Sequence, residues 1–321
     1  MGNRKPDAPA AGVDYPSTFG QFQDWFSTDE ACLEYLAKLR WPDGFICPRC
    51  RGTKSWTTGA GLRMCKDCSR RTSVTAGTIF DRTRTPMRTW FAAVWFVTSQ
   101  KNGVSALGLQ RALGLRSYET AWAWMHKLRR AMVVPGREML SGTVEVDETY
   151  VGGISRGMAG MSTTKVPVMI AAENLGRNRI GRVRLEPTPP GPLQAYEFAK
   201  RVVAPGSLIK TDGAAQFLHL TKDGYEHERY VQLGSQTPAH ETLPAVHMVA
   251  SQLKRWMIGT MHYGASREQF GYYLDEFTFR FNRRTSKSRG LLFYRLLNQA
   301  VQTEPHPLKT LVIPDDETNF S

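Results

Sequence analysis

The sequence predicts an α/β protein in which a small cysteine-rich module and a helical segment precede a larger core. Three observations support this prediction: two Cys-x-x-Cys pairs, helical patterns after them, and strand and helix patterns that alternate from about residue 142 to 297. A chain of 321 residues is long enough for two or three domains with buried cores. Its apolar runs, such as residues 90–97, are far shorter than the ~20 residues that span a bilayer.

The first 18 residues are polar and rich in Pro and Ala, without the apolar segment of a secretory signal. We expect them to form a flexible leader and the protein to be cytoplasmic. The chain has 42 Lys and Arg against 29 Asp and Glu, a formal charge of +13, with the excess in residues 47–88, 101–130 and 252–295. Such clusters indicate a nucleic-acid partner. The alternative is that the charge only keeps the protein soluble.

Four of the five cysteines form the two Cys-x-x-Cys pairs. They are Cys47, Cys50, Cys65 and Cys68. Tetrahedral Zn²⁺ takes four thiolates, and a Gly-containing hairpin over residues 51–64 would return the second pair to the first. The alternatives are redox-active pairs or disulfides, which a reducing cytosol disfavours. We therefore expect residues 19–85 to hold a helix, over Asp29–Leu39, and a structural zinc ribbon. Cys32, within that helix, is expected to be a buried small residue.

Helical patterns follow over residues 89–100, 105–113 and 117–132. The last two flank a short turn around Gly114, and the second of them ends in basic residues, which is typical of a helix-turn-helix. Segment 86–135 is therefore expected to bind DNA, although helical hairpins also occur without DNA. The basic residues expected to contact DNA from the ribbon and this segment are Arg63, Lys66, Arg70, Arg71, Lys127, Arg129 and Arg130.

The remainder alternates between strands and helices. Strands are predicted over 143–151, 165–172, 180–185, 207–213 and 230–233, and helices over 192–203 and 242–260. Three strands, a helix, a strand, a short strand and a helix follow one another in the ribonuclease H-like fold. The core is expected to span residues 142–300, followed by a tail over residues 301–321.

Two aspartates occupy informative places in this pattern. Asp147 lies inside one predicted strand and Asp212 ends another, where a carboxylate is costly unless a cation pairs with it. Two hard divalent cations, Mg²⁺ or Mn²⁺, would serve, and such a pair catalyses phosphoryl transfer. A third ligand usually follows on a helix. Here the predicted helix offers His247, with Lys254 two helical turns further along the same face.

These residues stand in motifs that resemble those of bacterial insertion-sequence transposases. The motifs are Val144-Glu-Val-Asp-Glu-Thr-Tyr-Val-Gly-Gly153, Thr211-Asp-Gly213, Leu253-Lys-Arg255 through Gly259-Thr260, and Tyr273-Leu-Asp-Glu-Phe-Thr-Phe-Arg-Phe-Asn-Arg-Arg284. The resemblance is to the group with an N-terminal zinc ribbon and a DDE-type ribonuclease H-like core, related to eukaryotic Merlin elements. It covers about Phe19 to Leu297. It implies that Asp147 and Asp212 are the first two metal-binding acids and that Lys254 is the basic residue after the third.

The chain departs from the family pattern at the third acid. Where the family commonly has a segment ending Ile-Glu-x-Phe-Trp-Ser-x-Leu-Lys-Arg, His247 replaces the Glu. Imidazole can bind a metal but carries no negative charge, and Mg²⁺ prefers oxygen. In order of preference, His247 is a neutral ligand or an acid–base group, the copy is impaired, or Glu241 takes over the position.

The resemblance implies a DNA transposase that hydrolyses the ends of its element and joins the freed 3′-OH to target DNA. It also implies a bacterial, nucleoid-associated protein that acts at least as a dimer, because two ends must be brought together. Further DNA contacts are expected from Arg255, Arg280, Arg283 and Arg284. Two alternatives stay open: a structure-specific nuclease of the same fold, and a zinc-ribbon regulator without catalysis.

Overall fold

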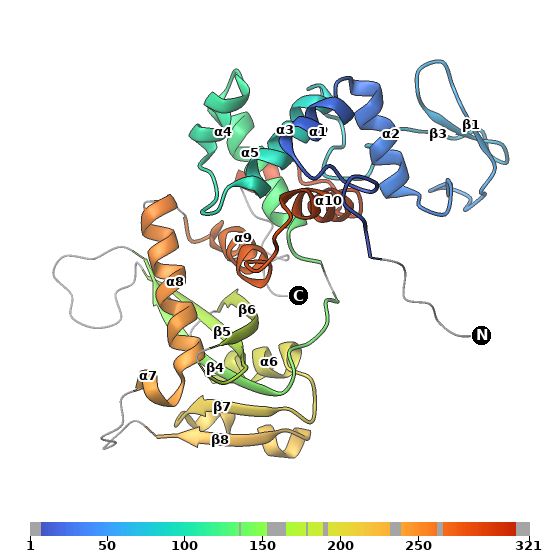
Figure 1. Cartoon of the computed structure of the whole chain (residues 1–321). Helices are drawn as coiled ribbons and strands as arrows, with labels where there is room; N and C mark the ends of the chain where they lie inside the picture. Colours follow the sequence, from blue (N-terminus) through green and yellow to red (C-terminus); the bar gives the residue numbers. More distant parts are fainter. Residues whose placement is uncertain are drawn as a thin grey trace. The chain divides into compact units, whose positions relative to one another are not determined.

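The computed structural model describes residues 8–134, 136–152, 165–177, 179–188, 192–231, 239–261 and 266–312. The chain divides into two compact units (Figure 1). Unit 1 combines the chain up to Val134 with the segment from Ser286 onward, and unit 2 spans Pro135–Thr285. Within the described ranges, no helix combines the length and the apolar character that crossing a membrane requires.

Unit 1 is built mainly from helices, and the N-termini of α1, α2, α4, α5 and α10 share one device. Each follows a Ser or Thr whose hydroxyl accepts a first-turn backbone N–H. The helices of the unit are α1 (Phe19–Trp25), α2 (Asp29–Arg40), α3 (Met87–Ser99), α4 (Ala106–Leu113), α5 (Tyr118–Ala131), α10 (Arg289–Ala300) and α11 (Leu308–Val312). Those predicted from the sequence over α2 to α5 are confirmed to within two residues.

An aromatic core holds unit 1 together. Phe293 of α10 packs edge-on against Phe22 and Phe91, with ring centroids 5.4 and 5.8 Å apart. Phe26 lies 4.8 Å from Phe91 and 5.6 Å from Phe293. Since α10 buries its apolar face here, the boundary expected at residue 300 differs from the structure, in which the core unit ends at Thr285.

The segment before α1 also differs from expectation. Tyr15 is buried, its ring lies 6.0 Å from that of Tyr294, and the backbone of Pro16 approaches Gly290 so closely that a Cβ there would clash. In the described part of the expected flexible leader, residues 8–18, Tyr15 and Pro16 are therefore packed, while most of the other residues are exposed; residues 1–7 lie outside the described chain. In the expected tail, Leu311 of α11 is buried, and residues 313–321 lie outside the described chain.

The ribbon is a small three-stranded antiparallel sheet. Its strands are β1 (Ser55–Thr57), β2 (Arg63–Cys65) and β3 (Arg71–Thr72), in the order β1-β2-β3. Trp56 pairs with Met64 across β1 and β2, and Met64 pairs with Arg71 across β2 and β3. The hairpin predicted over residues 51–64 is thus present. Its core is minute, with Phe45 and two cysteines as its buried members.

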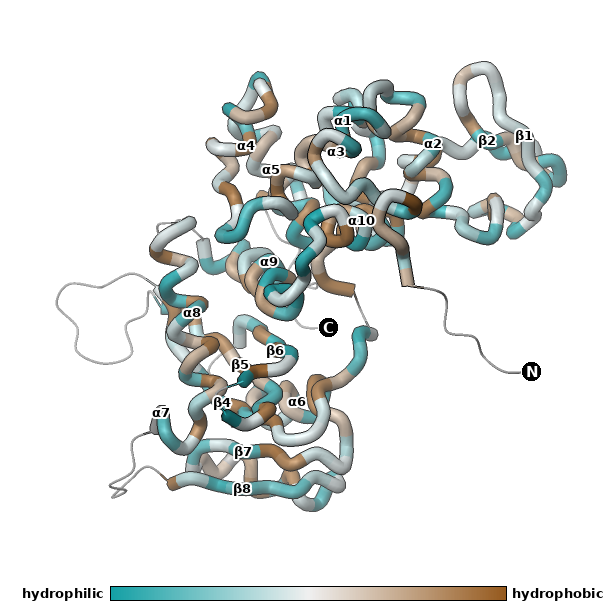
Figure 2. Tube along the Cα trace, viewed as in Figure 1, coloured by the Kyte–Doolittle hydropathy of each residue, from teal (hydrophilic) through white to brown (hydrophobic). Residues whose placement is uncertain are grey.

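Unit 2 contains a five-stranded sheet in the order β6-β5-β4-β7-β8. Its strands are β4 (Thr143–Val151), β5 (Val166–Asn174), β6 (Ile180–Pro187), β7 (Leu208–Asp212) and β8 (Glu226–Tyr230). The first three pair antiparallel, whereas β4–β7 and β7–β8 pair parallel. This mixed sheet confirms the ribonuclease H-like fold class. The last strand lies earlier than the predicted 230–233, at the hydrophilic edge of the sheet (Figure 2); residues 232–238 lie outside the described chain.

Helices cover both faces of the sheet (Figure 1). On one face α6 (Pro192–Val202) packs over Val144, Val146 and Ile209, near the short helices η1 (Ala215–Phe217) and η2 (Leu220–Asp223). On the other face α8 (Pro244–Met261) and α9 (Phe270–Asn282) pack over alternate residues of β5 and β6. The short α7 (Ala239–Thr242) precedes α8. The face under α8 is the one that carries the candidate site.

Candidate active site and zinc ribbon

Two aspartates meet on neighbouring strands of the unit 2 sheet. The parallel register of β4 and β7 pairs Val144 with Ile209 and Val146 with Thr211. The next residues along the two strands are Asp147 and Asp212, so their carboxylates come from adjacent positions. Val144 and Val146 point into the core under α6, and Asp147 therefore points to the opposite face, toward α8.

Helix α8 brings a histidine to this place. His247 lies in the first turns of α8, where its backbone N–H donates to the carbonyl of Leu243. Its Nε2 is 4.0 Å from Oδ2 of Asp147, and the two side chains are 38% and 20% exposed. The residues that the sequence predicts as first and third site members are thus neighbours on a surface that solvent reaches.

Crowding of negative charge marks the site. Burial raises the pKa of Asp147 to about 7, and the nearby carboxylates of Asp212, Glu148 and Glu145 contribute to the rise. The backbone N–H of Glu148, which donates to Asp147 Oδ1 at 2.8 Å, acts in the opposite direction. On the other strand the N–H of Ala214 donates to Asp212 Oδ1 at 3.2 Å. A bound cation would relieve this repulsion.

The donor set fits a hard divalent cation. Two carboxylates supply the oxygen atoms that Mg²⁺ and Mn²⁺ prefer, and a neutral imidazole adds a nitrogen donor. The donor atoms of Asp147, Asp212 and His247 are spread more widely than those of a closed site. Among the described residues, only the four ribbon cysteines form a group of potential ligands whose donor atoms all lie within 4.8 Å of one another. Two metals ~3.5–4 Å apart would accommodate a wider set.

The other two residues considered for the site lie elsewhere on the same segment. Lys254 is half-buried two turns after His247 on α8, and burial, with the charge of Lys165 as a second cause, lowers the pKa of its ammonium group. Glu241 is exposed on α7, before the break at Leu243 that separates α7 from α8. The geometry therefore favours His247 over Glu241 as the neighbour of Asp147.

A residue that the sequence analysis did not single out also belongs to the site. Glu145 lies two residues before Asp147 on the same face of β4 and is fully buried. An acid at a core position of an alternating strand is itself a signal, because an ionised carboxylate is rarely buried without partners. The partners of Glu145 come from α8 and β5.

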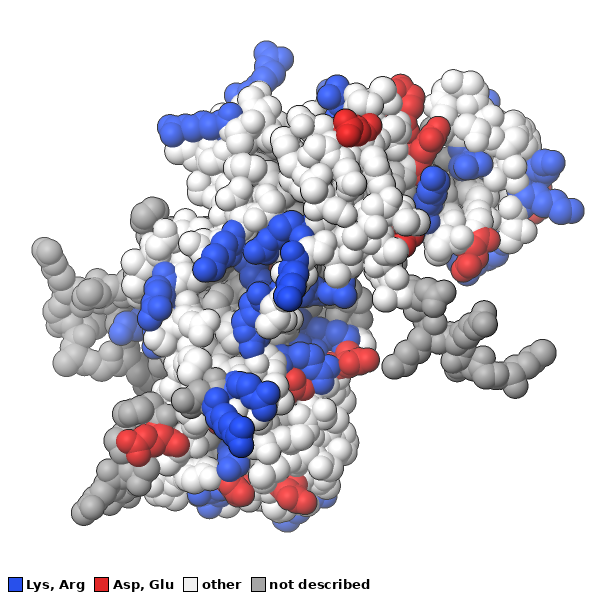
Figure 3. All heavy atoms as spheres, in the orientation of Figure 1, with Lys and Arg blue, Asp and Glu red and all other residues white. Residues whose placement is uncertain are grey.

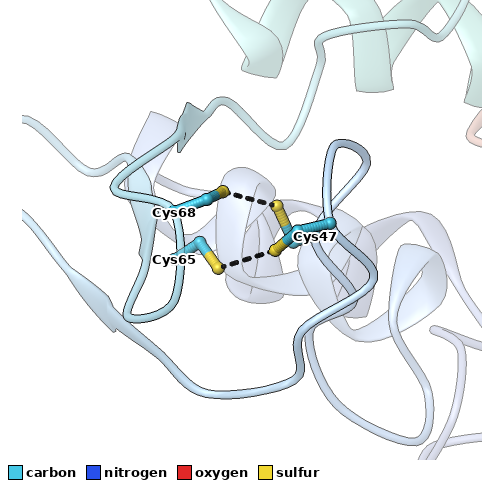
Figure 4. A group of neighbouring side chains, drawn as sticks. Cys47, Cys65 and Cys68 are labelled. Carbon is cyan, nitrogen blue, oxygen red and sulfur yellow. Dashed lines mark hydrogen bonds between the residues drawn. The ribbon is translucent and has the colours of Figure 1, made fainter.

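In unit 1 the four ribbon cysteines converge. Figure 4 shows the sulfur atoms of Cys47, Cys65 and Cys68 turned toward one another. Cys47 Sγ lies 3.6 Å from Cys68 Sγ, and Cys50 Sγ lies 3.5 Å from Cys65 Sγ. Four sulfurs bound tetrahedrally to Zn²⁺ at ~2.3 Å would be about 3.8 Å apart. The cluster thus fits a structural zinc ion with all four positions filled by protein.

The backbone around the cysteines repeats one turn twice. After each pair, the following residue, Arg51 or Ser69, has a positive φ, and its N–H donates to the carbonyl of the first cysteine at 3.0 Å. The backbone N–H of Cys50 lowers the pKa of Cys47, which favours the thiolate that a metal binds. Asp67 lies close to Gly52, so a Cβ at this position would force the carboxylate of Asp67 to move.

Comparison with known proteins agrees with this architecture. A family model described as "ISXO2-like transposase domain" matches residues 139–282, and one described as "Transposase zinc-ribbon domain" matches residues 27–71. The chain is also 26% identical over 288 residues to an "uncharacterized protein in transposable element ISH50" of Halobacterium salinarum, covering 79% of this chain and 91% of that protein. The chain belongs to the insertion-sequence transposases with an N-terminal zinc ribbon. The zinc-ribbon match contains all four cysteines, and the transposase-domain match contains Asp147, Asp212 and His247.

The basic residues expected to contact DNA differ in their availability in this transposase. Six of them are exposed: Lys66, Arg70, Arg71, Arg130, Arg255 and Arg284. Arg63, Lys127 and Arg283 are half-buried. On the face drawn in Figure 3, Lys and Arg side chains gather over α8, α9 and the adjoining part of unit 2.

Three of the expected contacts have structural partners instead. Arg129 is 2% exposed within α5 and is too deeply buried to reach a phosphate. Arg280 donates to the buried Glu276 at 2.7 and 2.9 Å within α9. Arg284 donates to the carbonyls of Ile180, Gly181 and Phe281, which ties the end of α9 to β6. These three side chains therefore have structural surroundings within the protein, and DNA contact through Arg280 and Arg284 stays a prediction.

Proposed function

We propose that this transposase cuts DNA at the ends of its element and joins the freed 3′-OH to target DNA by divalent-metal-dependent phosphoryl transfer. The observation that carries the proposal is the meeting of Asp147, Asp212 and His247 at one place on the sheet, under α8. Like charges crowd there, and among the described residues no Lys or Arg forms the ion pair with Asp147 that a structural salt bridge would supply. The zinc ribbon has no open ligand position and is assigned to structure.

The carboxylates of Asp147 and Asp212 would hold Mg²⁺ or Mn²⁺. When bound, such a cation neutralises charge on the attacked phosphate and lowers the pKa of an attacking hydroxyl or water. Asp147 must give up its proton to serve, and its raised pKa makes that loss complete only above neutral pH in the metal-free protein. His247 would place its imidazole beside Asp147, as a neutral nitrogen ligand or as an acid–base group.

Lys254 would hold a DNA phosphate as a point charge. It lies on the same face of α8 as His247, two turns away. Its lowered pKa follows from burial, and an anionic phosphate beside it would favour the charged form. The half-buried stem fixes where the ammonium group stands, which a freely moving surface lysine would not do.

The ribbon and the α4–α5 hairpin would bind the terminal repeats of the element. Gly114, in the left-handed conformation, ends α4, and Ser117 caps α5, and a short turn of this kind between two helices supports a helix-turn-helix role. Exposed Lys66, Arg70 and Arg71 would contact the DNA backbone from the ribbon. Joining two ends implies action as a dimer or larger assembly at the nucleoid.

A strand-transfer assay with pre-cut element ends tests the proposal. The purified protein with Mn²⁺ or Mg²⁺ should join the ends to a supercoiled plasmid, and the Asp147→Asn variant should bind the ends without joining them. Cleavage without joining would identify the structure-specific nuclease instead. Binding without either reaction, and without a metal requirement, would identify the regulator and overturn the proposal.

A further inference from the structure

Glu145 is a deeply buried acid beside the candidate site. Its side chain lies on the α8 face of β4, two residues before Asp147, and is 0% exposed. Burying a carboxylate costs several kcal/mol unless hydrogen-bond donors surround it. The surrounding donors therefore indicate what the residue holds in place.

Both carboxylate oxygens of Glu145 accept hydrogen bonds from other elements. Oε2 accepts the backbone N–H of Val246 at 2.9 Å, and Oε1 accepts Nδ2 of Asn174 at 2.5 Å. The amide of Asn174 is itself oriented, because its Oδ1 accepts the N–H of Gly176 at 2.8 Å. The carboxylate thus links β4 to the end of β5 and to the start of α8.

The contact at Val246 falls on the first turn of α8, which begins at Pro244. First-turn N–H groups have no partner inside their helix, and a carboxylate there also gains from the helix dipole. His247 is the next residue along the chain. One strand therefore carries Asp147 directly and fixes His247 through Glu145, so the two side chains share a common support.

We infer that Glu145 is a positioning residue, which anchors the first turn of α8 so that the imidazole of His247 stays beside Asp147. This inference rests on the proposed function, in which Asp147 and His247 serve one metal site. Glu145 itself is fully buried and its carboxylate is bound by Val246 and Asn174, so we assign it no direct contact with substrate or metal. Residues that support metal ligands in this way typically change metal affinity by about 10- to 100-fold when they are replaced.

The test is a donor–acceptor exchange in the full-length, zinc-loaded protein. In Glu145→Gln, the amide oxygen still accepts from Val246, but the amide nitrogen then faces the Asn174 nitrogen, whose orientation Gly176 fixes. In the double variant Glu145→Gln/Asn174→Asp, a carboxylate oxygen at position 174 can accept a hydrogen bond from the new amide nitrogen at position 145. Mn²⁺ affinity, measured by electron paramagnetic resonance, should fall about tenfold or more in the single variant and recover in the double variant.

A second readout does not involve metal. The ring signals of His247 in nuclear magnetic resonance spectra of the metal-free protein should shift in Glu145→Gln and return in the double variant. Glu173→Gln is the matched control, since Glu173 is a buried acid of the same sheet with its own partner, Arg182, at 2.6 Å. It should lower the melting temperature without changing Mn²⁺ affinity or the His247 signals.

The outcomes separate the inference from the function on which it rests. If Asp147→Asn leaves Mn²⁺ affinity unchanged, the proposed metal site fails. If Asp147→Asn lowers the affinity but Glu145→Gln changes neither the affinity nor the His247 signals, the positioning role alone is overturned. Should Glu145→Gln not fold, Asn174→Ala removes one donor and keeps the carboxylate; unchanged affinity and signals in that variant overturn the inference equally.

Discussion

Asp147 Oδ2 and His247 Nε2 lie 4.0 Å apart, although one residue is on a central strand and the other on a helix much later in the chain. The distance is short enough for both side chains to share one cation and too long for a direct hydrogen bond. Glu241, the rival for the third position, is exposed on α7. Substitutions at these three residues can therefore distinguish a metal ligand from a residue that is merely nearby.

Substitutions of His247 should show whether this residue is a metal ligand or only lies near the metal site. His247→Ala should be nearly inactive in strand transfer, whereas His247→Glu, which restores the commoner carboxylate, should retain measurable activity with Mg²⁺. Native protein should prefer Mn²⁺ to Mg²⁺, because Mn²⁺ tolerates a nitrogen ligand better. Glu241→Ala is the control and should change activity little. Full activity in His247→Ala together with loss in Glu241→Ala would transfer the third position to Glu241.

Removing one charge from the aspartate pair should lower activity and raise stability. Asp147→Asn or Asp212→Asn should reduce cleavage and joining by orders of magnitude while end binding persists. The raised pKa of Asp147 means that the folded state loses stability as pH rises toward 7 and bears the full penalty above it. Asp147→Asn should therefore melt higher than the native protein at pH 8 without metal, and Mn²⁺ should stabilise it less.

A control for that stability effect is Asp223→Asn. Asp223 pairs with Lys200 at 3.6 Å and accepts a hydrogen bond from Tyr196. Asp223→Asn therefore removes an attractive interaction, whereas Asp147→Asn removes a repulsive one. This variant should melt lower and keep the native response to Mn²⁺. A melting temperature of Asp147→Asn below that of the native protein at pH 8 would contradict the charge-crowding account.

The ribbon should depend on its metal. Replacing any one of Cys47, Cys50, Cys65 or Cys68 by Ser should release about one zinc per chain and unfold the ribbon, because a domain with so small a core draws its stability from the metal. Cys32→Ser should leave the zinc content unchanged: burial raises the pKa of Cys32 to about 12, so it stays a thiol. Elemental analysis of the purified variants measures the zinc content per chain. An equal loss of zinc in Cys32→Ser would refute the assignment.

The exposed cations of the ribbon should control salt dependence. Each of Arg70→Ala and Arg71→Ala should weaken end binding and reduce the slope of log Kd against log salt by about one unit for each phosphate that is no longer neutralised. Glu30→Ala, which removes an exposed charge of the opposite sign from α2, should leave the slope undiminished. Fluorescence anisotropy over a range of KCl concentrations measures the slope. Slopes that match the native value in both ribbon variants would exclude the ribbon from the interface.

Acid should destabilise unit 1 through a buried histidine. Burial lowers the pKa of His126 to about 3, so the folded state keeps it neutral while the unfolded chain takes up a proton near pH 6.5. Stability is therefore lost as pH falls below 6.5, by about 2 kcal/mol between pH 7.5 and 5. Urea unfolding of His126→Gln should show a smaller pH dependence than the native protein. Zinc release affects both proteins alike, and equal pH dependence would contradict this prediction.

The sequence was most informative where local pattern decides the structure. β4 has the predicted ends, because its apolar residues alternate, and α5 lies within the helix predicted over residues 117–132, with Ser117 as its N-cap. Four cysteines at metal-ligand spacing likewise identified the ribbon. These signals lie within short stretches of chain, so no knowledge of the tertiary structure is needed to find them.

The features that could not be predicted from the sequence depend on tertiary packing. No helix was predicted over α10, and its residues were expected to belong to the core over residues 142–300; Phe293 instead joins the aromatic core of unit 1. Charge alone did not distinguish buried Arg129 from exposed Arg130. The role of Glu145 was hidden because its partner Val246 contributes a backbone N–H, which every residue except proline carries.

The return of α10 to unit 1 makes unit 2 an insertion within the other unit. During synthesis the ribosome releases residues 135–285 before it releases Phe293, so the aromatic core of unit 1 closes only when almost the whole protein has emerged. A chain interrupted before α10 keeps the cysteines and the α4–α5 hairpin but lacks the helix that completes their support. If the zinc ribbon and the α4–α5 hairpin bind the element's ends as proposed, prematurely terminated copies would therefore compete poorly for those ends.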